Sequence, residues 1–223
     1  MKKPILALCF ACLVVGLAGA AAAQTTYDLA SYFQITHGQW RIEEERDLGN
    51  SQAPVQRVAF AVQRQGTFVL RNSFYWNGKD WVPDTVEVME VTPTHLIYYG
   101  EYDPVSGDYE IFTPALKIPR SLKLNQPFCH QGFLSTPKKT MAIPAILSIT
   151  ADNITKVVKA GTFTKCIRFK GSISANEVID SWSEVRAPGH GLVFGYDTIL
   201  DETEPEASMV WSGRYERTDP KKP

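Results

Sequence analysis

Hydrophobic and polar residues alternate with a period of two along most of the chain. Residues 55–63 read V-Q-R-V-A-F-A-V-Q and residues 67–76 read T-F-V-L-R-N-S-F-Y-W, with Gln65-Gly66 between them. Successive side chains of a β-strand point to opposite faces, so this alternation predicts strands that bury one face. Similar runs, rich in β-branched and aromatic residues and separated by turn residues, follow at regular spacing. They cover residues 79–82, 85–88, 94–102, 109–112, 145–150, 162–170, 178–185, 192–199 and 209–215.

Helical periodicity is nearly absent. Residues 28–33 are compatible with a short turn of helix, and no stretch keeps an i, i+3, i+4 apolar stripe over three turns. Ten or more short strands with turns between them predict a mainly β, antiparallel fold, for which a closed barrel and a β-sandwich are alternatives. The sequence shows no internal repeat and no linker. We therefore expect a single β-rich domain over residues 24–217, followed by a disordered tail at 218–223.

The dipeptide Asn77-Gly78 is the clearest hairpin signal, because both positions of a type I′ turn need positive φ. A two-residue loop there places Phe74 opposite Trp81 as an aromatic cross-strand pair. The middle of the chain, residues 113–145, is different. It carries five prolines, which predict long loops or edge strands. They are Pro114, Pro119, Pro127, Pro137 and Pro144.

The first 23 residues have the features of a signal peptide. Lys2 and Lys3 are followed by an uncharged, mostly apolar stretch that ends in four alanines, which suits cleavage before Gln24. An uncleaved membrane anchor is the alternative, since the apolar stretch is almost long enough to span a bilayer. The short basic leader is typical of bacteria. We expect a periplasmic or secreted protein with no transmembrane segment after cleavage.

Two of the four cysteines, Cys9 and Cys12, lie in this leader, which leaves Cys129 and Cys166 in the mature chain. An even pair of cysteines in an oxidising compartment predicts a disulfide between them. Two reduced cysteines buried as small hydrophobes are the competing interpretation. A zinc site that includes His130 is disfavoured, because no further ligands stand at suitable spacing.

Charge and motifs give little chemistry. The 223 residues have a formal charge of −1, and no basic cluster is interleaved with aromatics, so nucleic acid is not an expected partner. Nucleophile, zinc, phosphate-loop and dinucleotide motifs are missing, and we predict no catalytic residue, metal or cofactor. His37 and His190 stand beside glycines, where tight turns explain them. The run 43–45, three glutamates beside Arg41 and Arg46, is interpreted as a solvated strand face.

Three segments resemble a family of uncharacterised bacterial envelope proteins and lipoproteins. Residues 32–40, Y-F-Q-I-T-H-G-Q-W, resemble its Y-F-P-L-x-x-G-x-x-W opening; residues 158–166, V-K-A-G-T-F-T-K-C, are similar to its V-x-A-G-T-F-x-x-C segment; residues 187–193, A-P-G-H-G-L-V, resemble A-P-G-x-G-L-V. Gln34 replaces the family's proline, and Ile42 stands where an aromatic is usual. The resemblance implies a single curved antiparallel sheet, or half-barrel, like that of periplasmic lipoprotein carriers. It brings no catalytic residue.

The matched positions have a structural explanation of their own. Glycine and proline set turns, and large aromatics anchor one face of a sheet. We expect these residues to specify the fold rather than an activity. They are Phe33, Gly38, Trp40, Gly161, Phe163, Pro188, Gly189 and Gly191.

Three classes of function fit the sequence. The first is a non-enzymatic envelope protein that binds an apolar small molecule, a lipid or a hydrophobic protein segment in a cavity lined by aromatics. The second is a structural or interaction module that binds an envelope protein through sheet edges or an apolar patch. The third, a hydrolase with a convergent site, is the least favoured because no nucleophile motif is present.

Overall fold

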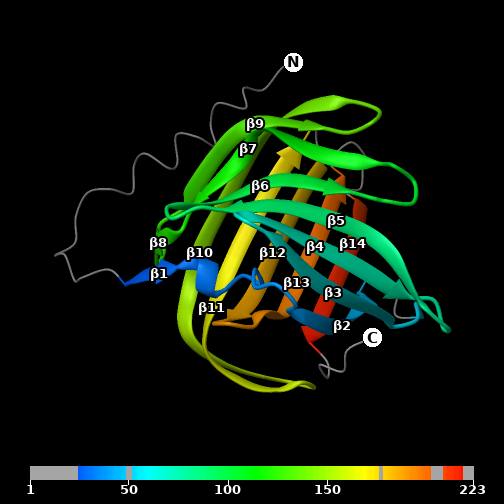
Figure 1. Cartoon of the computed structure of the whole chain (residues 1–223), viewed down its shortest axis with the longest axis horizontal. Coiled ribbons are helices and arrows are strands. Elements are labelled where there is room, and N and C mark those ends of the chain that lie inside the picture. The colour runs from blue at the N-terminus through cyan, green and yellow to red at the C-terminus, as the bar shows by residue number, and fades with distance from the viewer. Residues whose placement is uncertain (1–24, 49–51, 176–177, 202–207, 218–223) are drawn as a thin grey trace.

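The computed structural model describes residues 25–48, 52–175, 178–201 and 208–217 (Figure 1). The leader predicted at 1–23 and the tail predicted at 218–223 lie outside this range. The described residues form strands and one short 3-10 helix, η1 (Leu29–Ser31). The strands are β1 (Thr26–Asp28), β2 (Trp40–Asp47), β3 (Gln56–Gln65), β4 (Phe68–Trp76), β5 (Trp81–Val91), β6 (His95–Tyr102), β7 (Tyr109–Pro119), β8 (Ser121–Lys123), β9 (Phe128–Ser135), β10 (Thr140–Val158), β11 (Gly161–Ala175), β12 (Val178–Ala187), β13 (Gly191–Asp201) and β14 (Ser208–Arg217).

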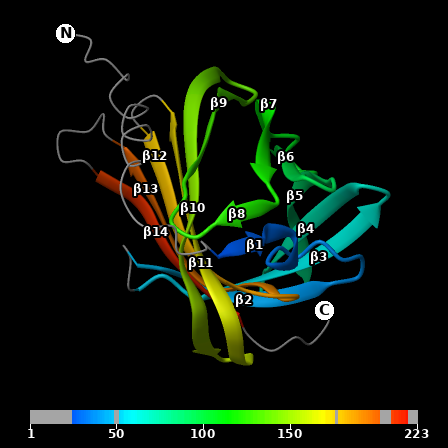
Figure 2. The ribbon, with the colours of Figure 1, turned by 90° about the vertical axis from the view of Figure 1, so that its left-hand side faces the viewer.

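Twelve of these strands form one antiparallel sheet in the order β10-β11-β12-β13-β14-β2-β3-β4-β5-β6-β7-β9. The sheet curves so strongly that its two ends meet at β9, which pairs with β10 over eight residues and with β7 over three. Figure 2 shows the curve, with β10 to β14 on one wall and β3 to β6 on the other. The prediction of a mainly β fold built on a single curved antiparallel sheet is therefore confirmed.

The proline-rich stretch 113–145, for which long loops or edge strands were predicted, consists mostly of strands. Strands β7, β8 and β9 and the start of β10 cover most of it. Pro114 lies in β7 immediately after the three residues that pair with β9. A proline has no N–H to donate to a neighbouring strand, which explains why Pro114 lies where the β7–β9 pairing ends. The stretch contributes strands at a short seam of the sheet rather than long loops.

The predicted register of the β4–β5 hairpin is wrong. Trp76 pairs with Trp81, so the loop has four residues, and Phe74 lies opposite Pro83. The reason is the side chain of Asn77, whose Oδ1 accepts hydrogen bonds from the backbone N–H groups of the third and fourth loop residues at 2.9 and 2.8 Å. This Asx turn replaces the two-residue turn. The aromatic pair is Trp76 with Trp81, with ring centroids 5.5 Å apart.

The beginning of the described chain lies inside the curve of the sheet. Among the described residues strand β1 pairs with the short β8, and both lie between the two walls (Figure 2). The short helix predicted over 28–33 is present as η1, and the Asp28 carboxylate accepts the N–H of Ala30 at 3.2 Å. Leu29 is fully buried and Tyr32 is 8% exposed, both within the main apolar core. The chain thus fills its own concave side with residues 27–35, which we call the inner segment.

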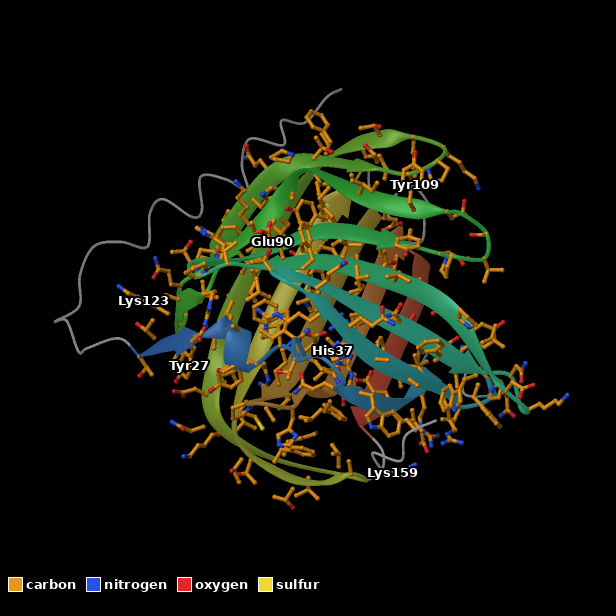
Figure 3. All side chains as sticks on the ribbon, viewed as in Figure 1. Tyr27, His37, Glu90, Tyr109, Lys123 and Lys159 are labelled. Atoms are coloured by element: carbon orange, nitrogen blue, oxygen red, sulfur yellow. The ribbon has the colours of Figure 1, made fainter. Side chains whose placement is uncertain are left out.

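The hairpin of β10 and β11 is much longer than its neighbours. Three register shifts between Ile149 and Lys156 bend it. Beyond the bend it lies across one end of the sheet, where Figure 3 shows Lys159. The ammonium group of Lys159 pairs with the Glu44 carboxylate of β2. A second, smaller apolar core lies here. Its members are Val158, Cys166, Val185, Ala187, Val193 and Phe194, with Ile154, Ala160 and Phe163 packed against them.

Candidate functional site

The three segments of the family resemblance meet in space. The N–H of Gly189 donates to the carbonyl of Ser31 at 2.7 Å, and the Gln39 amide donates to the carbonyl of Gly189 at 2.9 Å. The Phe163 ring stacks edge-to-face on His190, with centroids 5.2 Å apart. These contacts join the inner segment, the β10–β11 hairpin and the β12–β13 turn. Because the contacts are one backbone hydrogen bond, one hydrogen bond from a side-chain amide and ring packing, the cluster holds the inner segment in place.

The remaining predicted positions have structural environments. Gly38 has φ +76° and donates its N–H to the carbonyl of Val62 at 2.9 Å. At Gly191, with φ +75°, a Cβ atom would come 3.1 Å from Gln34. The other residues predicted to specify the fold lie at strand starts, in turns or against the core. Trp40 begins β2, Gly161 begins β11 with φ +133°, Pro188 follows β12, and Phe33 packs edge-to-face on Phe169 at 5.7 Å.

The predicted disulfide is not formed, because the sheet register keeps the two cysteines apart. Cys129 of β9 lies opposite Ile146 of β10, and Cys166 of β11 lies opposite Ile154. These positions of β10 are eight residues apart, roughly 20 Å or more at the usual rise of a strand. A disulfide needs Cα atoms within about 7 Å. Cys166 is fully buried and Cys129 is exposed, so the alternative of buried thiols fits Cys166 alone.

A strip of charged side chains crosses the concave side of β2. Arg41 and Glu43 are each 1% exposed and form an ion pair, and the Arg41 Nη1 donates to the Gln34 Oε1 at 2.8 Å. Burial lowers the pKa of Arg41 to about 10. The interpretation of residues 43–45 as a solvated strand face is therefore wrong for Glu43. Alternation places Glu43 inside, while Glu44 on the other face pairs with Lys159.

Two further ion pairs extend this strip on both sides. Arg71 of β4 binds the Glu87 carboxylate of β5, and Arg186 binds Glu184 within β12 at 2.6 Å. The guanidinium groups of Arg41 and Arg186 lie 4.1 and 4.0 Å from the ring centroids of Phe60 and Phe33. Each buried cation thus has one carboxylate and one aromatic face. We call this set the polar strip; it consists of Gln34, Arg41, Glu43, Arg71, Glu87, Glu184 and Arg186.

Carboxylates also gather toward one open end of the curved sheet. Glu101 of β6 lies directly opposite Glu110 of β7. Burial, together with the charges of Glu87 and Glu110, raises the pKa of Glu101 to about 7. Burial and a hydrogen bond to Asp197 raise the pKa of Asp180 to about 8. Burial, followed by the neighbouring like charges, thus favours the protonated forms of Glu101 and Asp180 near neutral pH.

The outer face of the same end is apolar. Tyr102 and Tyr109 face each other across β6 and β7, and Ile111 and Phe133 continue the surface onto β9. Their exposed fractions are 42, 38, 45 and 51%. Figure 3 shows Tyr109 at this end of the sheet. We call these four residues the outer patch. Its residues point away from the core, since the alternate residues Phe112 and Leu134 are buried.

One cavity lies near the outer patch, and another lies on the outer face of β10 to β13. The first, of about 300 Å³, lies between the β6–β7 and β9–β10 turns, and we call it the rim cavity. The second, of about 410 Å³, is a groove on the outer face of β10 to β13. The rim cavity is lined by Thr85, Glu101, Tyr102, Asp103, Asp108, Tyr109, Glu110, Thr136, Pro137 and Lys138. The groove is lined by Ile146, Ser148, Lys170, Gly171, Ser172, Ser181, Trp182, Ser183, Tyr196 and Thr198.

Neither cavity matches the aromatic-lined concave site that the sequence led us to expect. The groove is rich in hydroxyl groups, and the rim cavity is rich in carboxylates. Apolar side chains and the inner segment fill the concave side instead. Within the described ranges, no three His, Cys, Asp or Glu side chains are placed to hold a metal ion. The helix among these residues, η1, is far too short to cross a membrane.

Comparison with known proteins shows similarity of fold alone. No family model matches the chain, and no curated protein does. A solved structure from Bacteroides fragilis, a candidate exported protein with a YmcC-like fold, is 10% identical with a TM-score of 0.52, and the match covers 86% of this chain and 99% of that one. A candidate lipoprotein from Parabacteroides distasonis is 11% identical with a TM-score of 0.44, over 84 and 97% of the two chains.

The features that sequence reasoning missed are the polar strip and the outer patch. Arg41 and Glu43 carry a signal, since they are two apart on one strand and therefore share a face. The partners Arg71 and Glu87 are brought opposite each other only by the β4–β5 register. The outer patch needed the β6–β7–β9 register in the same way. Neither is a motif along the chain.

Proposed function

We propose that this protein is an exported, non-enzymatic module of the bacterial envelope that binds a partner protein through the outer patch. The outer patch carries the proposal. Four large apolar side chains, each more than a third exposed, adjoin one another across three strands. Contiguous exposed apolar surface of this kind is typical of interaction sites. The signal-like leader and the exported protein of similar fold support placing the protein in the envelope.

The concave side offers less support for an apolar ligand. Leu29, Tyr32 and the other apolar residues of the inner segment already occupy it. A fatty acyl chain would have to displace this segment, including the hydrogen bond from the N–H of Leu29 to the carbonyl of Arg120 at 2.7 Å. Fully burying one leucine side chain stabilises by about 1.5–3 kcal/mol, so displacement is costly. An interaction module therefore accounts for the structure better than a lipid carrier.

Site-specific photo-cross-linking in the producing bacterium tests this function. A photoreactive residue replaces Phe133 in the outer patch or, as the control, Phe68, which is 46% exposed on the outer face of β4. We expect a discrete protein adduct from position 133 and none from position 68. The adduct should disappear when Tyr109→Asp is added, because a carboxylate placed in the patch cannot be desolvated at low cost.

Two outcomes contradict the proposal. One is an identical adduct pattern from positions 133 and 68, which indicates collisions without a docking site. The other is a lipid mass that remains with the protein purified from its own envelope in native mass spectrometry. That lipid would restore the apolar-ligand hypothesis.

A further inference from the structure

The outer patch is divided between two strands that few backbone pairs hold together. Tyr109 and Ile111 belong to β7, whereas Phe133 belongs to β9. Among the described residues β7 pairs with β9 over three positions, 111–113 with 133–135, and we call these pairs the seam. On its other side β9 pairs with β10 over eight positions. The outer patch is therefore complete only while the seam is closed.

The imidazole ring of His130 lies at one end of the seam. Its side chain points inward, as does that of the buried Leu134 on the same strand. The ring donates a hydrogen bond to the backbone carbonyl of Pro114, which follows the seam on β7. A Cβ atom at Gly132 would come 3.0 Å from the His130 Nε2 and 3.0 Å from the Thr113 carbonyl oxygen, so the glycine makes room for the ring. The ring thus connects β9 to β7 where the backbone pairing stops.

The hydrogen bond to Pro114 determines which ring nitrogen of His130 carries the proton. Nε2 is buried and has no hydrogen-bond partner among the described residues, so the donor is Nδ1. The neutral ring therefore has its proton on Nδ1, and Nε2 is a bare acceptor. A second proton would put a charged N–H group at Nε2 with no acceptor, which is costly in a buried position. Burial accordingly lowers the pKa of His130, and the Pro114 carbonyl opposes this only in part.

The titratable groups on the surrounding strands do not compensate a charge on His130. Its pKa responds to burial and to the Pro114 carbonyl. Residues 140–147 of β10, which pair with β9, contain no charged side chain. The other groups are exposed on the outer face, beyond the far end of the seam, on β8, or three strands away in the same cross-strand row. They are, in that order, Cys129 and Lys117, Glu110, Lys123 and Asp180.

We propose that the seam is a pH-dependent switch of the outer patch: in acid, protonation of His130 separates β9 from β7, and the bound partner protein is released. This inference rests on the proposed function and adds its regulation. In the open state the ring reaches water, which accepts hydrogen bonds from both ring nitrogens. Ile111 and Phe133 then lie on separate strands that no longer pair, so the contiguous apolar surface is lost.

The direction of the effect follows from the two states of the ring. In the open state His130 has its ordinary pKa near 6.5, and in the closed state burial lowers the pKa. Closure is therefore fully stable above about pH 6.5 and weakens as the pH falls, by a factor of at most about thirty at pH 5. Glu101 and Asp180 act in the opposite direction, because their raised pKa values favour the folded protein at lower pH.

Hydrogen–deuterium exchange of the full mature protein measures the opening of the seam. After correction for intrinsic rates, the amides of residues 128–135 should exchange at least about threefold faster at pH 5 than at pH 7.5, whereas those of β3 should not change. His130→Gln keeps a side-chain donor for Pro114 but cannot be protonated, so it should remove the pH dependence. The matched variant His95→Gln, on β6, where the ring contacts the Thr94 hydroxyl at 2.8 Å, should retain it.

Photo-cross-linking from position 133 connects the switch to docking. In envelopes held at pH 7.5 the partner adduct should form, and at pH 5 its yield should fall at least about threefold. With His130→Gln the yield should be the same at both pH values. If this variant does not fold, the exchange midpoint of the unmodified protein decides. A midpoint below pH 6.5 supports His130, and a midpoint at pH 7 or above assigns the change to the carboxylates and overturns the inference.

The outcomes separate the switch from the docking function beneath it. Exchange of residues 128–135 that does not respond to pH, or that responds equally in His130→Gln, overturns the inference. An adduct of equal yield at both pH values also overturns it, and the docking function then stands. Absence of the adduct at both pH values removes the docking function and the switch together.

Discussion

The concave side of the sheet has two parts that follow opposite rules. Along β10 and β11 the inward residues are apolar, as at Leu147, Ile149 and Phe169, and the inner segment packs against them. Along β2, β4, β5 and β12 the ion pairs of the polar strip also point inward, beside apolar core residues such as Val69 and Met89. The apolar part tolerates any neighbour of suitable shape, whereas each charge of the strip requires one particular partner.

The difference shows that inward orientation and apolar character are separate properties in this sheet. Arg41 and Glu43 obey the same period-two rule as Leu147 and Ile149. What permits their burial is a set of three contacts of Arg41. They are the Glu43 carboxylate two residues along the same strand, the Gln34 amide of the inner segment and the Phe60 ring, which the β2–β3 register places opposite Arg41. Each of the following measurements tests whether the two parts respond differently.

Breaking the central ion pair should have the largest effect. Glu43→Leu leaves the buried Arg41 charge uncompensated and should lower the free energy of unfolding by about 3–5 kcal/mol, measured by urea denaturation. The matched change Glu44→Gln, on the opposite face of β2, should cost about 1 kcal/mol or less. If the double variant Arg41→Leu with Glu43→Leu is as unstable as Glu43→Leu alone, an uncompensated charge is not the cause.

Truncation in the apolar part should cost slightly less. Leu29→Ala removes a fully buried side chain of the inner segment and should lower the free energy of unfolding by about 2–5 kcal/mol. Val157→Ala, at a position 70% exposed, should change it by no more than about 0.5 kcal/mol. Equal, small effects at both positions would show that the inner segment does not belong to the folded core.

The pH dependence of stability should distinguish the apolar part from Glu101 and Glu45, two partly buried carboxylates that feel the charges of Glu87 and Glu43 in the polar strip. The folded-state pKa values of Glu101 and Glu45 are raised to about 7, chiefly by burial, above unfolded values near 4. Between these values the folded protein holds protons that the unfolded chain releases, so stability falls as pH rises toward 7 and above. Glu101→Gln should reduce the loss of stability between about pH 5.5 and about pH 8 by on the order of 1 kcal/mol, whereas Leu29→Ala should leave that loss unchanged. Thermal unfolding at about pH 5.5 and about pH 8 measures it.

A reducing agent should have the smallest effect, none on the melting temperature, because no disulfide joins Cys129 to Cys166. The two thiols should still react differently with a maleimide under native conditions. Cys129 is exposed and should react rapidly; Cys166 is fully buried, and burial raises its pKa, so its thiolate is scarce. An intact mass two hydrogens short of the dithiol form would contradict this.

The sequence predicted local structure better than pairing between distant strands. Period-two runs located most strands, and the turn glycines marked their ends. The prediction of the hairpin register failed at Asn77, because a hydrogen bond to its side chain stabilises a longer loop. The prediction of the disulfide failed because placing both cysteines in strands does not fix the distance between them. The register puts them opposite two positions of β10 that are eight residues apart. The polar strip was hidden for a related reason: a charged residue on a strand has the same spacing whether it faces water or an ion-pair partner.

The pairing of β2 with β14 affects the order in which the chain can fold. Asp47, at the end of the first long strand, lies opposite Gly213 in the last one. During synthesis β2 can pair with β3 early, but its other edge stays open until β14 has emerged. An open edge in a partly made sheet is a template for pairing with other chains. Late arrival of β14 therefore makes the last stage of folding the period of greatest risk of aggregation.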